Sequence, residues 1–204
     1  ARSRSGLFLL RNISAQEVFM KKSNGLKFSV FIATSVDGFI ARPDGDVAWL
    51  HEGEQLPKGE DAGYGELLNA VDALVMGRGS FEKVLEFNSW PYADKPVIVL
   101  SKSLTEIPSQ LPDVVSIDPA EPRAFTEKCL ARGYEHIYLD GGQVIQSFLR
   151  EGLVNEITIT TIPILLGEGI PLFGKIGRDI QLTLKKSRSW QNGFVQSTYE
   201  VLTR

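Results

Sequence analysis

The sequence predicts a single α/β domain built around a mostly parallel β-sheet. Strand and helix signals alternate from about residue 26 to residue 150, as is typical of strand–helix units in a parallel sheet. The strand segments are short and almost continuously apolar, which favours strands buried on both faces. After residue 150, three strand-like segments follow without helices between them, and they predict an antiparallel addition to the sheet.

The elements follow one another in a regular order. The first expected strand is residues 26–35 (LKFSVFIATS), which is broken at Asp37-Gly38 and resumes at residues 39–41 after that turn pair. Turn-forming residues 42–46 (RPDGD) come next. The remaining expected elements up to residue 150 are a helix at 60–71, a strand at 73–76, a helix at 80–85, strands at 96–101 and 114–117, a helix at 120–132, a strand at 137–139 and a helix from 141 to about 150.

The last third of the chain predicts strands at residues 155–165, 180–187 and 193–202. The turn-like triplet Gln191-Asn192-Gly193 separates the last two and indicates a hairpin. No internal repeat or low-complexity linker interrupts the pattern, so we expect one domain.

Composition narrows the class of protein. The chain has 204 residues, 43% of them hydrophobic, and is long enough to bury a sizeable core. The single cysteine, Cys129, excludes an internal disulfide and is interpreted as a helix-packing residue. With only two histidines besides, we expect no metal site. The net charge of −3 argues against nucleic acid, and no apolar run approaches a membrane span. A cytoplasmic location is expected.

The first 19 residues differ from the rest. They are rich in Arg and Ser and carry no acid before Glu17, and Met20-Lys21-Lys22 resembles a native start. We interpret residues 1–19 as an extension (a tag, an upstream segment or a targeting remnant) and residues 20–204 as the domain.

Three strand–helix or strand–loop junctions carry chemistry that suits phosphate. They are Gly77-Arg78-Gly79-Ser80, Ser101-Lys102-Ser103 and Asp140-Gly141-Gly142-Gln143. Parallel sheets bind ligands at the carboxyl ends of their strands, and helix N-termini there attract anions. Each junction alone is also compatible with a glycine corner, a surface ion pair or a solvated loop. Together they predict a dinucleotide, although the G-x-G-x-x-G fingerprint after the first strand is absent.

The sequence resembles the dihydrofolate reductase-like superfamily, in particular the reductase domain of bifunctional riboflavin-biosynthesis deaminase–reductases and its stand-alone relatives. The matching segments are ATSVDGFIARPDGDVAWL (33–50), DALVMGRGSFE (72–82), KPVIVLSKSL (95–104) and LDGGQVIQSFLREGLVNEITITTIPILLGEGIPLFG (139–174). The resemblance implies a three-layer fold, with helices on both faces of a mixed, mostly parallel sheet and a C-terminal antiparallel hairpin.

The resemblance also implies a cofactor site along the carboxyl edge of the sheet. The positions matching that site are Ala33, Ile40, Gly77, Arg78, Ser80, Ser101, Lys102, Gly141, Gly142 and Gln143. Arg78 and Lys102 would favour a 2′-phosphate, so the expected cofactor is NADPH rather than NADH. The implied chemistry is hydride transfer to a C=N or C=O carbon.

The acid for such a reaction is harder to assign. Trp49 matches the tryptophan that precedes a buried carboxylate in dihydrofolate reductases, but the segment after it does not align. The acids available there are Glu52, Glu54, Glu60 and Asp61. Asp61 and Tyr64 lie three residues apart, on one face of the expected helix, and are our candidates for orienting or protonating a substrate.

Asp37 is a third catalytic candidate because it follows the strand expected to end at the nicotinamide, although Asp-Gly is also an ordinary turn pair. Trp49, Leu166 and Gly167 are expected to contact the substrate; core packing is the competing interpretation for Trp49.

The leading functional hypothesis is an NADPH-dependent reductase of a small pterin- or pyrimidine-like heterocycle or a carbonyl compound. The alternatives are a non-catalytic NADP(H)-binding or ligand-sensing protein, and a structural module whose glycines only turn corners. We also expect a homodimer formed through a sheet edge at residues 157–164.

Overall fold

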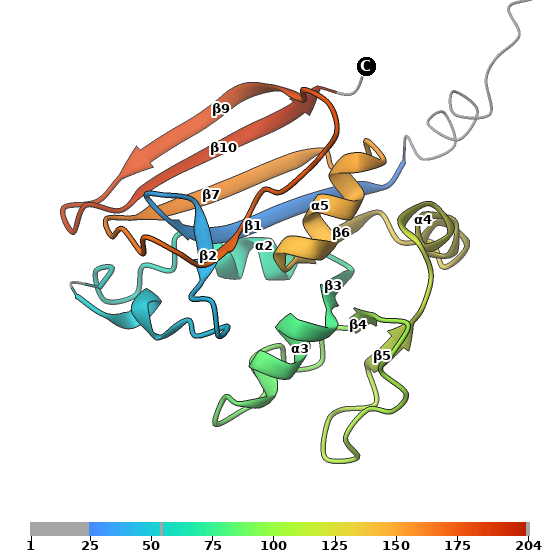
Figure 1. Cartoon of the computed structure of the whole chain (residues 1–204). Coiled ribbons are helices and arrows are strands. Elements are labelled where there is room, and N and C mark those ends of the chain that lie inside the picture. The colour runs from blue at the N-terminus through green and yellow to red at the C-terminus, as the bar shows by residue number, and fades with distance from the viewer. Residues whose placement is uncertain (1–24, 54, 203–204) are drawn as a thin grey trace, which may run out of the picture.

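The computed structural model describes residues 25–53 and 55–202, so the expected extension 1–19 and Glu54 lie outside the described residues. One eight-stranded sheet organises the fold (Figure 1). In spatial order its strands are β5 (Val115–Asp118), β4 (Val97–Leu100), β3 (Ala73–Gly77), β6 (His136–Asp140), β1 (Lys27–Ser35), β7 (Glu156–Ile162), β10 (Val195–Leu202) and β9 (Gln181–Ser189). The pairings from β5 to β7 are parallel, and β10 and β9 continue the sheet antiparallel.

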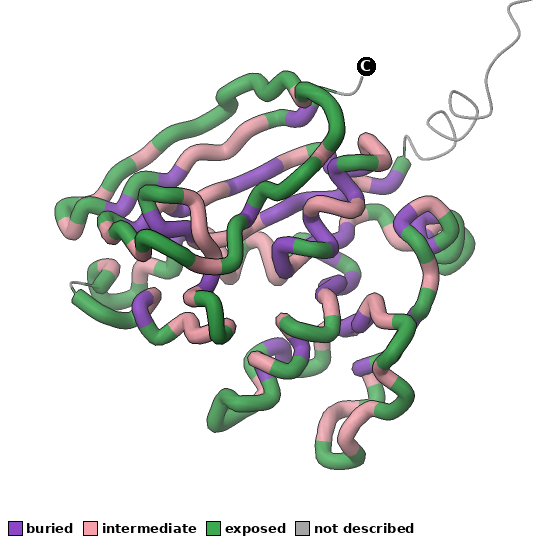
Figure 2. Tube along the Cα trace, viewed as in Figure 1, coloured by how far each residue is buried: buried purple, intermediate pink, exposed green. Residues whose placement is uncertain are grey.

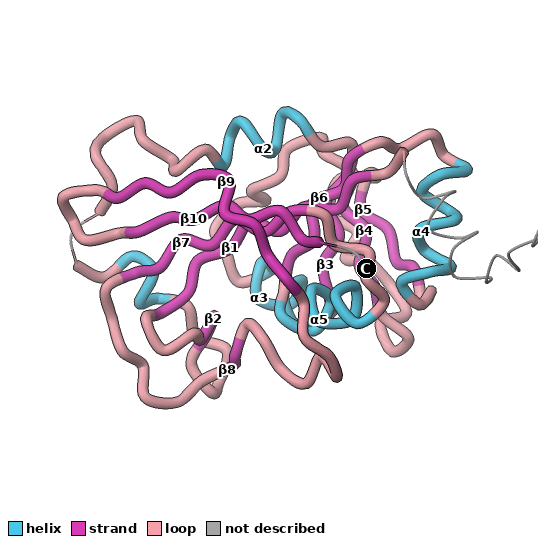
Figure 3. Tube along the Cα trace, turned by 90° about the horizontal axis from the view of Figure 1, so that it is seen from above, coloured by secondary structure: helices cyan, strands magenta, loops and turns pink. Residues whose placement is uncertain are grey.

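Helices cover both faces of the sheet. On one face, α2 (Tyr64–Ala70) and α3 (Arg78–Leu85) share an apolar cluster with β3 and β4. On the other, α4 (Pro122–Ala131) and α5 (Gly142–Arg150) pack into a second cluster. Figure 3 shows α2 and α5 on opposite sides of the strands. This confirms the predicted three-layer α/β fold with a terminal antiparallel hairpin.

The amphipathic pattern of α5 explains how the layers hold together. Val144, Ile145, Phe148 and Leu149 fall on one stripe of the helix and are all buried against the sheet. The ring centroid of Phe148 lies 5.0 Å from that of Phe28 on β1. Figure 2 shows that burial is concentrated in the central strands and in the helix faces turned toward them. The core therefore lies under the strands that end at the predicted cofactor edge.

Helix α2 begins later than the sequence suggested. The expected start was residue 60, but the Asp61 carboxylate accepts the backbone N–H groups of Gly63 and Gly65, each at 2.8 Å, and Gly63 has a φ of +89°. This turn holds residues 61–63 outside the helix. The prediction that Asp61 and Tyr64 share a helix face was therefore wrong: Asp61 precedes the helix that Tyr64 begins.

Two short elements at the carboxyl edge complete the fold. Strand β2 (Phe39–Ala41), which was expected, pairs with β8 (Ile170–Pro171), which was not. A 3₁₀ helix, η1 (Ala48–His51), was also missed. A two-residue strand carries no periodicity of its own, so only its tertiary partner defines β8.

The expected sheet edge at residues 157–164 was wrong. Strand β7 pairs with β1 on one side and with β10 on the other, so it is an interior strand. Because the C-terminal hairpin adds β10 next to β7, the exposed edge at this end of the sheet is β9. Within residues 25–53 and 55–202, no helix is long and apolar enough to cross a membrane. No cluster of metal-binding side chains occurs in the same part of the chain.

Candidate active site

The three phosphate-suited junctions meet at one edge of the sheet. Strands β4, β3 and β6 are parallel neighbours, so their carboxyl ends lie side by side. In the register, Gly77 pairs with Leu100 of β4, and Met76 pairs with Asp140 of β6. The segments that follow each strand therefore leave the sheet next to one another, as a ligand spanning several junctions would require.

Gly141 shows how closely two of these junctions approach. Its φ is +83°, and a Cβ at this position would lie 2.2 Å from Ser80 Oγ and 4.0 Å from the Gly77 nitrogen. A side chain would clash with Ser80 and would also have to adopt an unfavourable backbone conformation. Only glycine allows the start of α5 to lie against the start of α3.

Gly142 lies against the β2–β8 pair, next to the contact between Gly141 and Ser80. A Cβ on Gly142 would lie 3.1 Å from Ile40 Cδ1 and 3.2 Å from the Pro171 carbonyl oxygen. The structure thus brings together Ile40, Gly77, Ser80, Gly141 and Gly142, which the sequence comparison had placed in one cofactor site.

Two helices present their N-termini to this edge. The first residues after Gly77 and Gly141 begin α3 and α5, and neither helix has a side-chain cap hydrogen bond. The first N–H groups of a helix have no intrahelical partner and carry partial positive charge. Arg78 opens α3, is more than half exposed, and pairs with Glu82 at 3.7 Å. Gln143 is exposed in the first turn of α5.

The remaining junction already contains an ion pair. Ser101 Oγ accepts the backbone N–H groups of Ser103 and Leu104 and so closes the turn after β4. Lys102 extends from that turn and pairs with Glu121, the residue before α4, and both side chains are well exposed. A phosphate that bound Lys102 would have to compete with the Glu121 carboxylate.

A cavity of about 340 Å³ lies beside β1 and β7, on the face covered by α2. Its walls are mainly apolar, and four polar or charged side chains reach it. The lining residues are Phe31, Ala33, Leu50, His51, Gln55, Leu56, Glu60, Ala62, Thr160, Ile162 and Phe194. Ala33, expected at the nicotinamide, is among them. A few polar groups in an apolar cavity of this size are typical of a small-molecule site.

Trp49 supports this cavity from behind. The indole is 1% exposed and packs with Ile162 and Phe194, both of which line the cavity. Core packing, the competing interpretation, therefore describes Trp49 itself, while its neighbours Leu50 and His51 face the cavity.

A polar network that sequence reasoning missed fixes one side of the cavity. Buried Gln196 donates to Thr160 Oγ1 at 2.9 Å and to the Ala62 carbonyl at 3.1 Å, and accepts from Arg188 Nε at 2.9 Å. Arg188 also pairs with Glu60 at 3.7 Å. These bonds attach the segment after η1 to β7 and β10, so of the three candidate acids that the structure describes, Glu52, Glu60 and Asp61, it is Glu60 that lines the cavity.

Asp37 forms hydrogen bonds to the loop that contains Leu166 and Gly167, which were predicted to contact the substrate. Its carboxylate accepts Ser35 Oγ–H at 2.6 Å and the backbone N–H groups of Leu166 and Gly167 at 3.2 and 2.8 Å. The hydrogen bond from Ser35, with those from Gly167 and Leu166, lowers the pKa of Asp37. Asp37 therefore positions the 166–167 loop, and its lowered pKa makes it a poor proton donor.

Backbone amides also donate hydrogen bonds to Asp61, whereas the surroundings of Tyr64 are dominated by burial. Hydrogen bonds from the Gly65 and Gly63 amides lower the pKa of Asp61. Burial, and then the charge of Asp140, raise the pKa of Tyr64 to about 12, and its ring packs near Phe31 and Tyr138. Tyr64 is therefore a neutral phenol at neutral pH, and its ring packs on the sheet face covered by α2. Asp61 instead accepts the backbone hydrogen bonds that close the turn before α2.

The burial of the Asp140 carboxyl group was not predicted from the sequence. Burial raises its pKa to about 6, although the Gly141 amide and the Tyr138 hydroxyl partly oppose this effect. Tyr138 donates to the Phe31 carbonyl at 2.8 Å and lies 3.5 Å from Asp140 Oδ1. Asp140 therefore directly precedes the Gly141 junction, and Tyr138 connects it to Phe31 in the cavity wall. Perturbed carboxyl groups in such places are candidates for proton transfer.

With the site described, comparisons with known proteins define the family. Residues 27–196 match the RibD C-terminal domain, and the chain belongs to that family. It is 34% identical over 168 residues to the uncharacterised protein YwjB of Bacillus subtilis, a match covering 80% of this chain and 92% of YwjB. The fold and family therefore define a reductase-like protein of the RibD C-terminal type.

Solved structures of other proteins show the same fold. A Shewanella sp. PV-4 protein with a proposed role in riboflavin biosynthesis superposes with a TM-score of 0.82 at 40% identity, covering 87% of this chain and 99% of that one. The Thermotoga maritima diaminohydroxyphosphoribosylaminopyrimidine deaminase/5-amino-6-(5-phosphoribosylamino)uracil reductase shares the fold, with a TM-score of 0.64 at 13% identity. That match covers 92% of this chain and 60% of the Thermotoga chain.

We expect Gly141→Ala to lower the free energy of unfolding by about 1–3 kcal/mol, because alanine is strained at positive φ and would push Ser80 away. Urea unfolding measures the loss. Gly79→Ala is the matched control, since nothing lies within 4 Å of its Cβ position and alanine favours helix α3. Equal stabilities of the two variants would contradict the proposed close approach.

Asp140 should also leave a signature in the pH dependence of stability. The pKa in the folded state, about 6, lies above the ordinary value of 3.8, so the folded protein binds the proton more tightly than the unfolded chain. Stability should therefore fall as pH rises from about 4 through 6, by about 2 kcal/mol after allowing for partial exposure of the side chain. Asp140→Asn should remove this decline in urea titrations between pH 4 and 7.5. Parallel curves for the two proteins would rule the effect out.

Proposed function

We propose that this protein is an NADPH-dependent reductase that transfers a hydride to a small heterocyclic substrate bound in the cavity beside β1. The observation that carries the proposal is the meeting of the glycine junctions, two helix N-termini and the cavity at one edge of the sheet. Ala33 belongs to the cavity wall and lies one strand away from the Gly141 junction, so a bound dinucleotide could reach both.

The residues present fit a dinucleotide phosphate. Glycine at positions 141 and 142 lets Ser80, Ile40 and the Pro171 carbonyl approach the start of α5, and α3 and α5 offer N–H groups there that no side chain caps. Arg78 supplies an exposed cation at the same edge, and Lys102 supplies another after β4. Charge-assisted contacts of this kind contribute about 1.5–3 kcal/mol each and support NADPH over NADH.

The cavity favours a planar nitrogen heterocycle. Phe31, Leu56 and Phe194 offer apolar walls, while Glu60 and Thr160 offer hydrogen-bonding oxygens. A pterin or a pyrimidine combines flat faces with ring N–H groups in this way. A solved Corynebacterium diphtheriae protein sharing the fold at 19% identity is itself described as pyrimidine reductase-like. No Lys or Arg lines the cavity among the described residues, so it offers little to a phosphorylated sugar.

The residues of the protein must supply the proton and orient the substrate. NADPH, when bound, supplies the hydride. Asp140, with a pKa raised to about 6 by burial, retains a protonated fraction near neutral pH and can donate a proton from its carboxyl oxygen. The Tyr138 hydroxyl donates to the Phe31 carbonyl and lies 3.5 Å from that carboxyl group, and Tyr64 lies near enough for the charge of Asp140 to raise its pKa. Hydride and proton together complete reduction of a C=N or C=O bond.

One observation favours the alternative of a non-catalytic NADP(H)-binding or ligand-sensing protein. The two predicted acids, Asp37 and Asp61, are both occupied by backbone amides and have lowered pKa values. If Asp140 does not donate a proton either, none of these three acids does, and the protein could still bind the cofactor. Asp140 therefore separates the two functions.

Nucleotide binding tests the cofactor proposal directly. NADPH at about 100 times its dissociation constant should stabilise the protein by about 2.7 kcal/mol in thermal unfolding, and NADH should do so much less. Lys102→Gln should weaken NADPH binding about tenfold or more, because a phosphate contact is lost. Glu121→Gln should strengthen it by a factor of up to about five, because Lys102 is released from its ion pair. NADH affinity, measured by calorimetry, should stay the same in both variants. No melting shift with either nucleotide would sink the reductase proposal.

Turnover tests the role of Asp140. With NADPH oxidation followed against a panel of dihydropterins, aminopyrimidinones and small carbonyl compounds, Asp140→Asn should lower kcat by about 100-fold or more while leaving NADPH affinity unchanged. Asp113→Asn, on an exposed loop between β4 and β5, is the control and should keep full activity. Full activity in Asp140→Asn would exclude it as the proton donor; binding without turnover in the wild type would favour the sensing function.

A further inference from the structure

Arg188 on β9 has several partners in the polar network beside the cavity. Its guanidinium donates from Nε to Gln196 at 2.9 Å, pairs with Glu60 at 3.7 Å and lies 4.3 Å from the centroid of the Trp190 ring. It also approaches the backbone at Gly63, where a Cβ would lie 3.5 Å from Nη2. The side chain is 28% exposed. Contacts on several sides hold this long side chain in one place, which is unusual for a surface cation.

The arginine sets the direction of the hydrogen bonds in this network. A guanidinium has only donors, so the group of Gln196 that faces Arg188 Nε is the amide oxygen. The Gln196 amide nitrogen then donates to Thr160 Oγ1 at 2.9 Å and to the Ala62 carbonyl at 3.1 Å. Because a carbonyl only accepts, both ends of the network require the same orientation of Gln196. The glutamine is 5% exposed, so water offers it little alternative.

This orientation leaves the hydroxyl proton of Thr160 available to a ligand. A hydroxyl has one proton and two lone pairs, and the N–H of Gln196 occupies a lone pair. If the Gln196 amide were reversed, its oxygen would accept the Thr160 proton instead. Thr160 lines the cavity, and none of the described residues accepts a hydrogen bond from its Oγ1. Thr160 can therefore donate to an acceptor atom of a molecule bound in the cavity.

Glu60 offers the opposite polarity to the same cavity. Its Oε1 accepts the backbone N–H of Ala62 at 2.8 Å and faces Arg188. No hydrogen bond from the described residues reaches its second oxygen, Oε2, although the side chain lines the cavity and is 33% exposed. One oxygen therefore fixes the carboxylate in place, and the other can accept an N–H from a ligand.

We propose that Arg188 is a specificity-determining residue of the substrate cavity, because it fixes Thr160 as a hydrogen-bond donor and Glu60 as an acceptor. The inference rests on the proposed reductase function and narrows its substrate to rings that present an acceptor to Thr160 and an N–H to Glu60. A ring with an amino group in place of the acceptor leaves the Thr160 proton unpaired and binds less well. Arg188 does not line the cavity, so it is a positioning residue that acts through Gln196 and Glu60.

Two probes that differ in one group test this polarity by calorimetry, with and without NADP⁺. Pterin has a carbonyl oxygen at ring position 4, where 2,4-diaminopteridine has an amino group, and both keep an amino group that can donate to Glu60. The wild type should bind pterin about tenfold more tightly than 2,4-diaminopteridine. Arg188→Met should bring the two affinities within about twofold of each other, because the Gln196 amide can then reverse. Arg188→Lys keeps a donor and should retain most of the preference.

A second pair of variants does not depend on the folding of Arg188→Met. Thr160→Ser keeps the hydroxyl and should keep the preference for pterin. Thr160→Val has nearly the same shape without the hydroxyl and should lose the preference. A loss in both variants alike would show that the shape of the β7 side chain, and not its proton, decides the preference, and would contradict the proposal.

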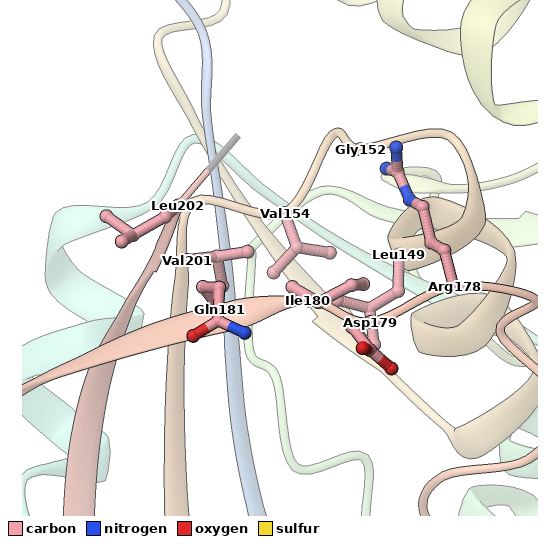
Figure 4. Close-up of a pocket in the computed structure, with 9 residues that line it drawn as sticks. All are labelled: Leu149, Gly152, Val154, Arg178, Asp179, Ile180, Gln181, Val201 and Leu202. Carbon is pink, nitrogen blue, oxygen red and sulfur yellow. The ribbon is translucent and has the colours of Figure 1, made fainter. Parts of the chain in front are cut away.

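A second hollow supplies the matched control, because it also contains an arginine. It has a volume of about 320 Å³ and lies where the end of α5 meets the beginning of β9 and the end of β10 (Figure 4). Arg178 lines this hollow, and none of its lining residues lines the cavity. Arg178→Met therefore removes a cation without touching the network and should leave both affinities unchanged. If it abolished the preference instead, the probes would bind in the hollow and the proposal would be wrong.

The outcomes also separate this inference from the reductase proposal. Equal affinities of the wild type for the two probes, binding of neither probe, or an unchanged preference in Arg188→Met would overturn the role of Arg188. None of these results touches the cofactor proposal, which depends on the melting shift with NADPH. A preference that follows Arg188 as expected, in a protein that NADPH does not stabilise, would support the role of Arg188 and overturn the reductase proposal alone.

Discussion

The contact between Gly141 and Ser80 is the constraint on which the proposed site depends. It forces the start of α5 against the start of α3, and so places two helix N-termini within one small region of the sheet edge. A helix N-terminus alone attracts anions weakly, but two that converge can bind neighbouring phosphates of one ligand. The parallel pairing of β3 and β6 makes the contact possible, because it brings their carboxyl ends to the same level.

The same edge contains a carboxyl group whose ionisation lowers the stability of the folded state. Burial raises the pKa of Asp140 and of the tyrosines near it, Tyr138, Tyr64 and Tyr92, and a tyrosine side chain has no positive charge to compensate an ionised carboxylate. A carboxyl group in such a place destabilises the folded state once it ionises. The neighbouring acids, Asp37 and Asp61, show the opposite arrangement, because amide donors stabilise their charged forms. The contrast between these environments separates an acid suited to proton transfer from acids suited to holding loops.

Local patterns in the sequence were sufficient for the parts of the site that depend on short stretches of chain. The apolar strand followed by Gly77-Arg78 or by Gly141-Gly142 predicts both a turn and a helix start, and the strand order then brings them together. The acid could not be predicted in this way. The pKa of Asp140 depends on burial by the folded chain, and the position of Glu60 at the cavity depends on Arg188 and Gln196, which are distant in sequence. The Asp61–Tyr64 spacing misled because an Asp-centred turn delayed the helix.

The strand register decides which side chains of β9 and β10 point toward the cavity. Residues of β10 and β9 that point toward α2 include Gln196 and Arg188, which anchor the segment bearing Glu60 and thus form one wall of the cavity. Because side chains alternate along a strand, placing the polar and charged residues on this side leaves the other side to Leu182, Leu184 and Val195. A slip of one residue would exchange the two sets, removing the cavity wall and placing lysines on the opposite side. The pairing that builds the cavity therefore also leaves an uncharged surface on the other side of these strands.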